Sequence, residues 1–321
     1  MTAMRSVGHV STPVLPGGRP KAVLVDEVCE VRSPAIQVDD PAGPSRDGLV
    51  TPSGSGPENR LASDQGAAVS SAATMARATK RVLLVDSVVW PHGLEPDPRR
   101  DVCGWFRRWT PPSSPVEWTR VGVETDINAA QSPGAWDGVI LSGSPRDAWT
   151  DDPVNLQLGE WILRCRDGGV PVLGVCYGHQ LMGRVLGARV APHPEGLELG
   201  NTPVTLTPAG RASRLFEGLP KQFDVLSSHS DVVSNLPPGL SHTVAGSFAA
   251  VQGMQDSTGL LHGVQFHPET DPETLRLIWN PRRDLWRPRV RFDLDAVLDH
   301  LKPTPSGPRI LHNFLQHFVR G

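Results

Sequence analysis

One cysteine stands in a sequence context where a thiol can act as a nucleophile. Cys176 follows an apolar run at residues 170–175 and precedes a segment with helical spacing at 178–186. A tight turn from strand to helix exposes the side chain at its apex, and Gly174 and Gly178 let the two elements approach. The positive end of a helix dipole also favours a thiolate there. We therefore interpret Cys176 as a nucleophile. The other cysteines are interpreted as ordinary buried residues: Cys29, Cys103 and Cys165.

A thiol nucleophile needs a proton carrier, and the carrier needs a group that orients it. A strand-like run at 260–266 delivers His267 at its end, and Glu269 follows two residues later. Pro268 stiffens the link between them, so the carboxylate can reach back to one imidazole nitrogen while the other faces Cys176. The residue types predict a Cys-His-Glu triad.

The elements that must position these side chains alternate along the chain. After residue 80, apolar β-branched runs alternate with helical patterns, which is typical of an α/β fold with a parallel sheet. Expected strands lie at 81–85, 116–120, 138–141, 170–175, 204–206, 222–226, 243–245, 250–254 and 260–266, and expected helices at 98–109, 156–166, 178–186, 272–279 and 309–319. We predict a three-layer α/β fold, with a central, mostly parallel sheet, helices on both faces and the site at the carboxyl ends of the strands.

The first 78 residues differ in composition from the rest. All eighteen aromatic residues of the 321-residue chain lie between Trp90 and Phe318. A segment rich in Pro, Gly, Ser and Ala and without large rings buries too little apolar area to offset its chain entropy. We expect residues 1–78 to be a disordered arm, or to be untranslated if Met75 is the true start. Residues 79–321 are expected to form one domain, with an arginine-rich insertion at 280–305 before the C-terminal helix.

Charge and hydropathy exclude several classes of protein. The 31 basic and 34 acidic residues give a formal net charge of -3, which argues against a nucleic-acid binder. No apolar run approaches the roughly 18 residues of a membrane span, and no secretion signal opens the chain. Four cysteines without paired spacing suggest neither a zinc site nor a disulfide framework. We expect a cytoplasmic protein whose chemistry needs no metal or organic cofactor.

The two motifs together resemble those of a known family. Gly-Val-Cys-Tyr-Gly-His-Gln at 174–180, followed by Phe-His-Pro-Glu at 266–269, is similar to the class I (triad) glutamine amidotransferases, particularly their stand-alone, GMP-synthase-like members. The resemblance implies a flavodoxin-like fold, with Cys176 as nucleophile, His267 as general base and acid, and Glu269 as its orienting partner. The thiolate would attack the γ-carboxamide of glutamine and release ammonia, and water would hydrolyse the resulting thioester to glutamate.

The resemblance also implies the surroundings of the triad. The backbone N–H of Tyr177 would be one oxyanion donor, and the other would come from Gly143 or Ser144 in the Ser-Gly-Ser-Pro loop at 142–145. Gln180 matches a substrate-contacting glutamine. The remaining expected pocket residues are Ser228, His229 and Ser230. Their segment resembles one that lines the glutamine pocket of GMP synthase, with Ser230 in place of a glycine. His179 and His229 are interpreted as structural or pocket-wall groups.

Three functions stay open at this point. The protein is a glutaminase-type amidotransferase that passes ammonia to a synthetase partner, a hydrolase of γ-glutamyl peptides or amines, or a non-catalytic member of the family. An intact triad argues against the last. The arginine-rich insertion is either a docking face for an acidic partner or a solvated surface loop. The sequence does not identify the acceptor of the ammonia or the γ-glutamyl group, the pathway or the oligomeric state.

Overall fold

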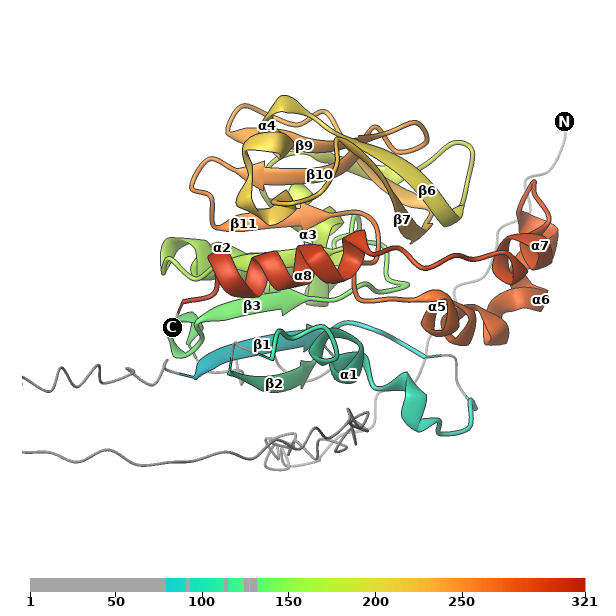
Figure 1. The fold of residues 1–321 in the computed structure, drawn as a ribbon, viewed down its shortest axis with the longest axis horizontal. Coiled ribbons are helices and arrows are strands. Elements are labelled where there is room, and N and C mark those ends of the chain that lie inside the picture. Colours follow the sequence, from blue (N-terminus) through green and yellow to red (C-terminus); the bar gives the residue numbers. More distant parts are fainter. Residues whose placement is uncertain (1–78, 91–92, 113–114, 124–126, 128–131, 321) are drawn as a thin grey trace, which may run out of the picture.

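The computed structural model describes residues 79–90, 93–112, 115–123, 127 and 132–320. The expected N-terminal arm, with Cys29 and Met75, lies outside the described residues. The part that the structure describes folds around one large sheet (Figure 1). No helix in this part is long and apolar enough to cross a membrane.

The large sheet has nine strands in the order β2-β1-β3-β4-β11-β10-β9-β6-β7. Strands β2, β1, β3, β4 and β11 pair in parallel, and the pairs from β11 to β7 are antiparallel. The strands of this sheet are β1 (Lys80–Asp86), β2 (Val116–Gly122), β3 (Gly138–Leu141), β4 (Val172–Val175), β6 (Glu198–Leu206), β7 (Gln222–His229), β9 (Leu240–Gly246), β10 (Val251–Asp256) and β11 (Leu261–Val264). A separate ribbon pairs β5 (Arg189–Pro192) with β8 (Asp231–Ser234).

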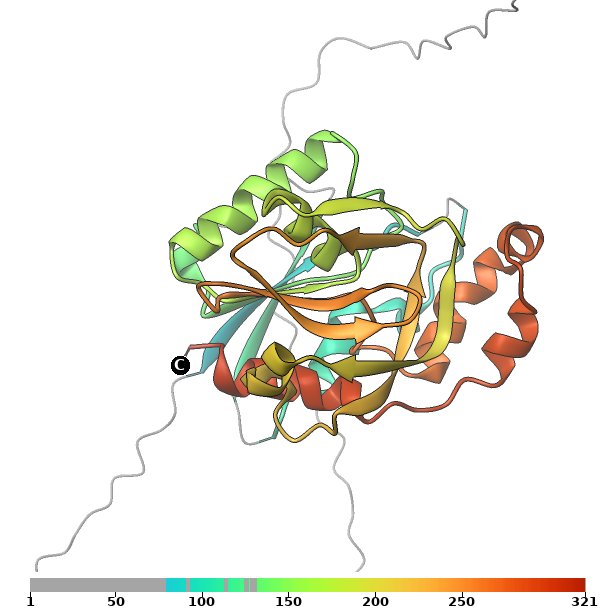
Figure 2. The ribbon, with the colours of Figure 1, turned by 90° about the horizontal axis from the view of Figure 1, so that it is seen from above.

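Helices cover both faces of the sheet. The α-helices are α1 (Val102–Arg107), α2 (Pro153–Asp167), α3 (Tyr177–Val185), α4 (Pro208–Ala212), α5 (Pro272–Trp279), α6 (Arg283–Trp286), α7 (Leu294–Asp299) and α8 (Ser306–His317). The 3-10 helices are η1 (Pro98–Arg100), η3 (Pro133–Ala135), η4 (Arg214–Phe216), η5 (Asn280–Arg282) and η6 (Arg287–Arg289). One apolar core packs α1 and α8 against the sheet, and a second packs α2 and α3 against it. The view from above shows α2 and α8 on opposite sides of the sheet (Figure 2). The three-layer α/β fold predicted from the sequence is confirmed.

One expected helix is broken in the structure. Residues 98–109 form the short η1 and then α1, with extended backbone at Asp101 between them. The Asp97 side chain accepts a hydrogen bond from the Arg99 N–H and caps the start of η1, and the extended backbone at Asp101 ends it after three residues. A competing cap of this kind is local chemistry that hydrophobic spacing does not register.

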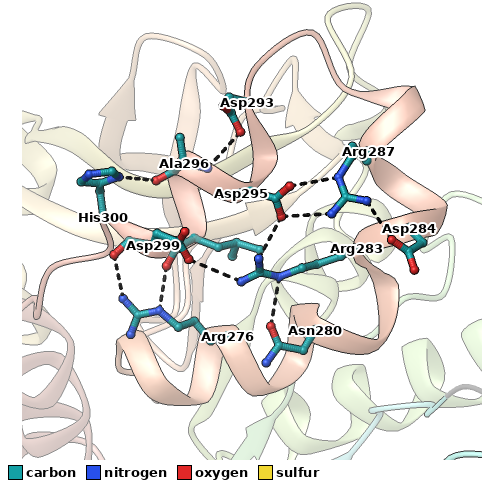
Figure 3. Close-up of polar contacts among 11 residues, drawn as sticks. Arg276, Asn280, Arg283, Asp284, Arg287, Asp293, Asp295, Ala296, Asp299 and His300 are labelled. Carbon is teal, nitrogen blue, oxygen red and sulfur yellow. Dashed lines mark hydrogen bonds and ion pairs between the residues drawn. The ribbon is translucent and has the colours of Figure 1, made fainter.

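The insertion at 280–305 is folded around an ion-pair network of its own. It consists of η5, α6, η6 and α7, which project from one end of the sheet (Figure 1). Arg283 pairs with Asp295 at 2.8 Å, and Arg287 pairs with Asp295 at 3.0 Å and with Asp284 at 2.8 Å (Figure 3). These arginines are therefore neutralised within their own segment.

Candidate active site

Cys176 lies between β4 and α3, at the apex of the expected elbow. Its backbone has φ 50° and ψ −100°, in a region that side-chain-bearing residues seldom adopt and that is retained mainly at functional sites. The approach of strand and helix is tight, because a Cβ added at Gly174 would lie 2.6 Å from the carbonyl carbon of Gly178. Packing on both sides of the turn therefore holds the strained residue in place.

Strand register brings His267 to the same edge of the sheet. Strand β11 pairs in parallel with β4, with Val264 opposite Val175, and the Cys176 N–H donates to the Val264 carbonyl at 2.9 Å. Three residues further on, the His267 N–H donates to the carbonyl of Leu226 in β7 at 2.8 Å. The segment that ends β11 is thus held by backbone hydrogen bonds to the end of β4 and to β7, which positions the imidazole beside Cys176.

The His267 ring bonds to Glu269 on one side and lies beside Cys176 on the other. Its Nδ1 is 2.8 Å from Oε1 of Glu269, and the side chains of both are almost fully buried. Burial by itself lowers the pKa of His267. The interactions of the ring with Glu269 and with Cys176 outweigh that effect, so the pKa of His267 lies well above its usual value. An imidazolium is therefore stabilised between a carboxylate and a thiol.

The loop after β3 packs its backbone against this pair. A Cβ added at Gly143 would lie 2.7 Å from Cε1 of His267 and 3.6 Å from Cβ of Cys176. The loop is held by the residue after β1, because the Ser142 hydroxyl accepts a hydrogen bond from the Ser87 N–H at 2.8 Å. Backbone N–H groups of a loop this close to a nucleophile can stabilise an oxyanion formed there.

Tyr177 ties the nucleophile turn to the same loop. Its hydroxyl donates to Oδ1 of Asn155 in α2 at 2.6 Å, and the amide of Asn155 donates to the carbonyls of Asp147 at 2.9 Å and Thr150 at 3.0 Å. Burial raises the pKa of Tyr177, which keeps the hydroxyl a donor. The ring lies in the core shared with α2 and α3. Only the backbone of Tyr177 is available to the site.

A cavity of about 180 Å³ opens over the pair. Nine of the ten residues expected from the sequence line it, and the exception is Tyr177. They are Gly143, Ser144, Cys176, Gln180, Ser228, His229, Ser230, His267 and Glu269. The dimensions suit a small ligand rather than a polymer.

Hydrogen bonds fix the polar wall of the cavity. The side-chain amide of Gln180 donates to the carbonyl of Asp231 at 2.9 Å. His229 lies 2.7 Å from a Glu198 carboxylate oxygen, which holds its ring as part of the wall. The Ser228 carbonyl is 3.8 Å from the Cys176 thiol, and its hydroxyl accepts from the Trp279 indole at 2.9 Å. These residues are pre-organised before a ligand binds.

Two carboxylates also face the cavity, those of Asp231 and Asp147, and of these Asp147 was not singled out from the sequence. Burial raises the pKa of Asp231 to about 6, and the charge of neighbouring Asp147 adds to the rise, while a hydrogen bond from Trp149 opposes it. Two carboxylates that destabilise one another create a favourable position for a cationic group. Asp231 follows directly after the expected 228–230 segment, so its place beside the pocket was available from the sequence.

The apolar wall of the cavity was also missed. It comes from α1 and from the segment that begins with α5, and it consists of Trp105, Ile278, Trp279 and Trp286, with Arg282 among them as a cationic neighbour. Ile278, Arg282 and Trp286 follow each other at intervals of four, which is the spacing of one helical face. That periodicity indicates a helical face, whereas the arginine-rich composition of the segment is typical of a surface loop.

His179 lies outside the cavity although it belongs to the cysteine motif. It is completely buried, and burial lowers its pKa to about 3. It packs beneath β11, where a Cβ added at Gly263 would lie 2.5 Å from its Nδ1. Within the described ranges, no group of three or more His, Cys, Asp or Glu side chains could hold a metal ion.

A family model and several curated relatives match this chain. The family model for class-I glutamine amidotransferases matches residues 113–277. A GMP synthase (glutamine-hydrolyzing) of Thermomicrobium roseum is 40% identical over 132 residues, which make up 41% of this chain and 23% of that protein. The same enzyme of Thermobifida fusca is 35% identical over 167 residues, 52% of this chain and 28% of that protein. The chain thus matches about a quarter of the length of these relatives.

Solved structures share the fold. A glutamine amidotransferase from Thermotoga maritima superposes with a TM-score of 0.60 at 20% identity, covering 76% of this chain and 100% of that one. A glutamine amidotransferase from Methylobacillus flagellatus gives a TM-score of 0.53 at 18% identity over 77% of this chain and 97% of that one. At these identities the likeness concerns the fold alone.

Proposed function

The chain belongs to the class-I glutamine amidotransferases, and on this basis we propose that it hydrolyses a γ-glutamyl amide, L-glutamine included, through a thioester on Cys176. The observation that carries this proposal is the buried His267, which bonds to Glu269 through Nδ1 and lies beside the Cys176 thiol. A proton carrier oriented by a carboxylate and placed next to a thiol at an elbow is the arrangement that nucleophilic acyl transfer requires.

The reaction divides into two acyl transfers. The Cys176 thiolate adds to the γ-carbonyl carbon, and the oxyanion receives N–H donors from Tyr177 and from Gly143 or Ser144. His267 then gives its proton to the amide nitrogen, the C–N bond breaks, and the amine leaves with the thioester formed. In the second half His267 removes a proton from water, the hydroxide adds to the thioester, and Cys176 leaves as thiolate with glutamate released.

The polar end of the cavity supplies recognition of the γ-glutamyl part. The carboxylates of Asp231 and Asp147 face the same space, and an α-ammonium group bound between them would relieve their mutual repulsion. Gln180, whose amide donates to the Asp231 carbonyl, presents a further polar group there. These contacts favour an amino-acid-like substrate over a simple amide.

The fate of the ammonia is the second part of the proposal. The curated relatives are named glutamine-hydrolysing GMP synthases, and the match covers about a quarter of their length. A partner synthetase that consumes the ammonia is therefore the natural counterpart of this domain. Hydrolysis of a γ-glutamyl peptide or amine is the second candidate, and the apolar wall beside Arg282 favours it, because free glutamine has no group to fill that space.

The test is the release of glutamate and ammonia from L-glutamine by the purified chain, with Cys176→Ala as the matched control. We expect turnover that disappears in the variant. Thiol labelling provides a second readout, because Cys176 lines the cavity whereas burial raises the pKa of Cys165 to about 12. A glutamine-analogue electrophile should therefore modify Cys176 well before Cys165. Glutamate release that persists in Cys176→Ala, or labelling of Cys165 first, would contradict the proposal.

A further inference from the structure

Two arginines enclose Trp90 beside the active-site cavity. The guanidinium carbon of Arg100 lies 5.2 Å from the centroid of the Trp90 ring, and that of Arg282 lies 5.4 Å from it. Trp90 in turn packs edge-on against Trp105 at 6.1 Å, and both Trp105 and Arg282 line the cavity that contains Cys176. Arg282 therefore lines the cavity of the proposed reaction, and Arg100 lies next to it across the Trp90 ring.

Neither arginine has a carboxylate partner among the described residues. Arg282 donates to the backbone carbonyls of Ile278 and Val89, and Arg100 donates to the carbonyl of Glu95 at 2.5 Å. The carboxylate of Asp97 interacts electrostatically with Arg100, but its ion-pair partner is Arg99, at 2.7 Å. Arg283 and Arg287, by contrast, pair with aspartates of the insertion (Figure 3).

Arg282 lies in an electrostatically unfavourable position. Burial lowers the pKa of Arg282, and the charge of Arg100 lowers it further. A partly desolvated cation next to a second cation costs free energy that an anion would recover. Guanidinium groups bind carboxylates through paired hydrogen bonds, so an anionic ligand group is the chemistry that fits.

The rest of this end of the cavity is apolar. Trp105, Ile278, Trp279 and Trp286 form its walls. The carboxylate pair Asp147 and Asp231 also lines the cavity, so the one space presents both an acidic pair and a cationic, aromatic region. A γ-glutamyl group with its α-ammonium fits the acidic pair, and a larger amine bearing an anionic group fits the aromatic region.

Resting on the proposed hydrolysis of a γ-glutamyl amide, we propose that Arg282 and its aromatic surroundings bind the leaving group of a γ-glutamyl amino acid. The substrate class is a γ-glutamyl dipeptide with an apolar second residue, whose free carboxylate contacts Arg282. In the reaction the bond between the carbonyl carbon and the nitrogen of the γ-amide breaks as the thioester with Cys176 forms, His267 supplies the proton, and the second amino acid leaves as its amine. Water then releases glutamate.

The experiment compares γ-L-glutamyl-L-phenylalanine with its C-terminal amide, which has the same size and lacks the charge. We expect the acid to have a kcat/KM at least about tenfold higher than the amide, since a hydrogen bond between two charged groups is stronger than one to a neutral amide. In Arg282→Gln the ratio of acid to amide should fall towards one. Arg287→Gln is the matched control, because Arg287 is exposed, already paired and outside the cavity lining, and it should keep the wild-type ratio.

The outcomes separate this inference from the proposed function. Cys176-dependent turnover of glutamine with equal rates for acid and amide would overturn the inference and leave the proposed function standing. Calorimetric binding of both dipeptides to Cys176→Ala supplies a readout that does not need turnover. Tighter binding of the acid, lost in the Cys176→Ala/Arg282→Gln double variant, supports the inference, and equal affinity for acid and amide overturns it.

Discussion

The backbone of Gly143 lies directly against the ring of His267. A Cβ added to Gly143 would be 2.7 Å from Cε1 of that ring, a separation that carbon atoms of folded proteins do not tolerate. The Cβ of Cys176 would lie 3.6 Å from the same added atom. The loop after β3 therefore sets the position of the imidazole by contact, in addition to any hydrogen bond that it offers to a substrate.

The Gly143→Ala substitution tests this contact. The methyl group must displace His267 or the loop, and a shift of about 1 Å at a reacting group costs roughly 100-fold in rate. We expect kcat/KM for glutamine to fall by about that factor while the thermal midpoint changes little, because the loop is at the surface of the cavity. Gly134→Ala is the control, since nothing lies within 4 Å of its added Cβ. Wild-type activity in Gly143→Ala would contradict the contact.

Glu269→Gln separates orientation from charge in the triad. An amide can still meet Nδ1 of His267, but the negative charge that raises the pKa of His267 is lost while burial remains. We expect kcat to fall by about 10²- to 10⁴-fold, as for other carboxylates that orient a histidine. The alkaline limb of the pH–rate profile should also move to lower pH, because an imidazolium with a lower pKa loses its proton earlier as pH rises. An unshifted limb would remove Glu269 from this role.

The elbow was predictable because its determinants are local. An apolar run, small residues on either side of Cys176 and an immediate helix specify a strand–turn–helix without reference to the rest of the chain. His267 was harder to place, because its position depends on β11 pairing with β4 in the register that sets Val264 opposite Val175. Strand order cannot be read from spacing, and the resemblance to a family supplied what the physical pattern did not.

The aromatic wall could not be assembled from the sequence for the same reason. Trp105 belongs to α1 and Trp279 and Trp286 to the segment after β11, so their meeting depends on how two distant helical segments dock. Composition is also a poor guide here, since Arg282 belongs to an arginine-rich segment in which Arg283 and Arg287 pair with aspartates at the surface. One arginine of the segment turns inward, and only tertiary structure distinguishes it from its neighbours.

Tyr177→Phe tests the tether between the nucleophile turn and the loop after β3. The change removes the donor to Asn155 and leaves a buried amide oxygen without its partner, which costs about 1–3 kcal/mol. Asn155 also holds the carbonyls of Asp147 and Thr150, so the loop should loosen. We expect a lower thermal midpoint and a fall in kcat that exceeds the change in KM. A variant that loses stability but keeps kcat would show that the tether serves the fold alone.

His179 should make the fold sensitive to acid. Burial lowers its pKa to about 3 in the folded protein, whereas a histidine in an unfolded chain titrates at about 6.5. Between these values the unfolded chain binds a proton that the folded chain refuses. The stability that a neutral His179 provides is therefore complete above pH 6.5 and is lost progressively as pH falls towards 3.

The slope of stability against pH measures this contribution. At full effect, one such histidine removes up to about 1.4 kcal/mol of unfolding free energy for each unit of pH. Urea unfolding at pH 7, 6 and 5 should therefore give a flatter dependence for His179→Met, which cannot titrate, than for the wild type. His262, whose pKa burial lowers to about 4, remains in both proteins and cancels in the difference. His300→Gln is the control, because His300 is exposed, and it should leave the slope unaltered. An equal slope in His179→Met and wild type would show that His179 does not control the acid limit of the fold.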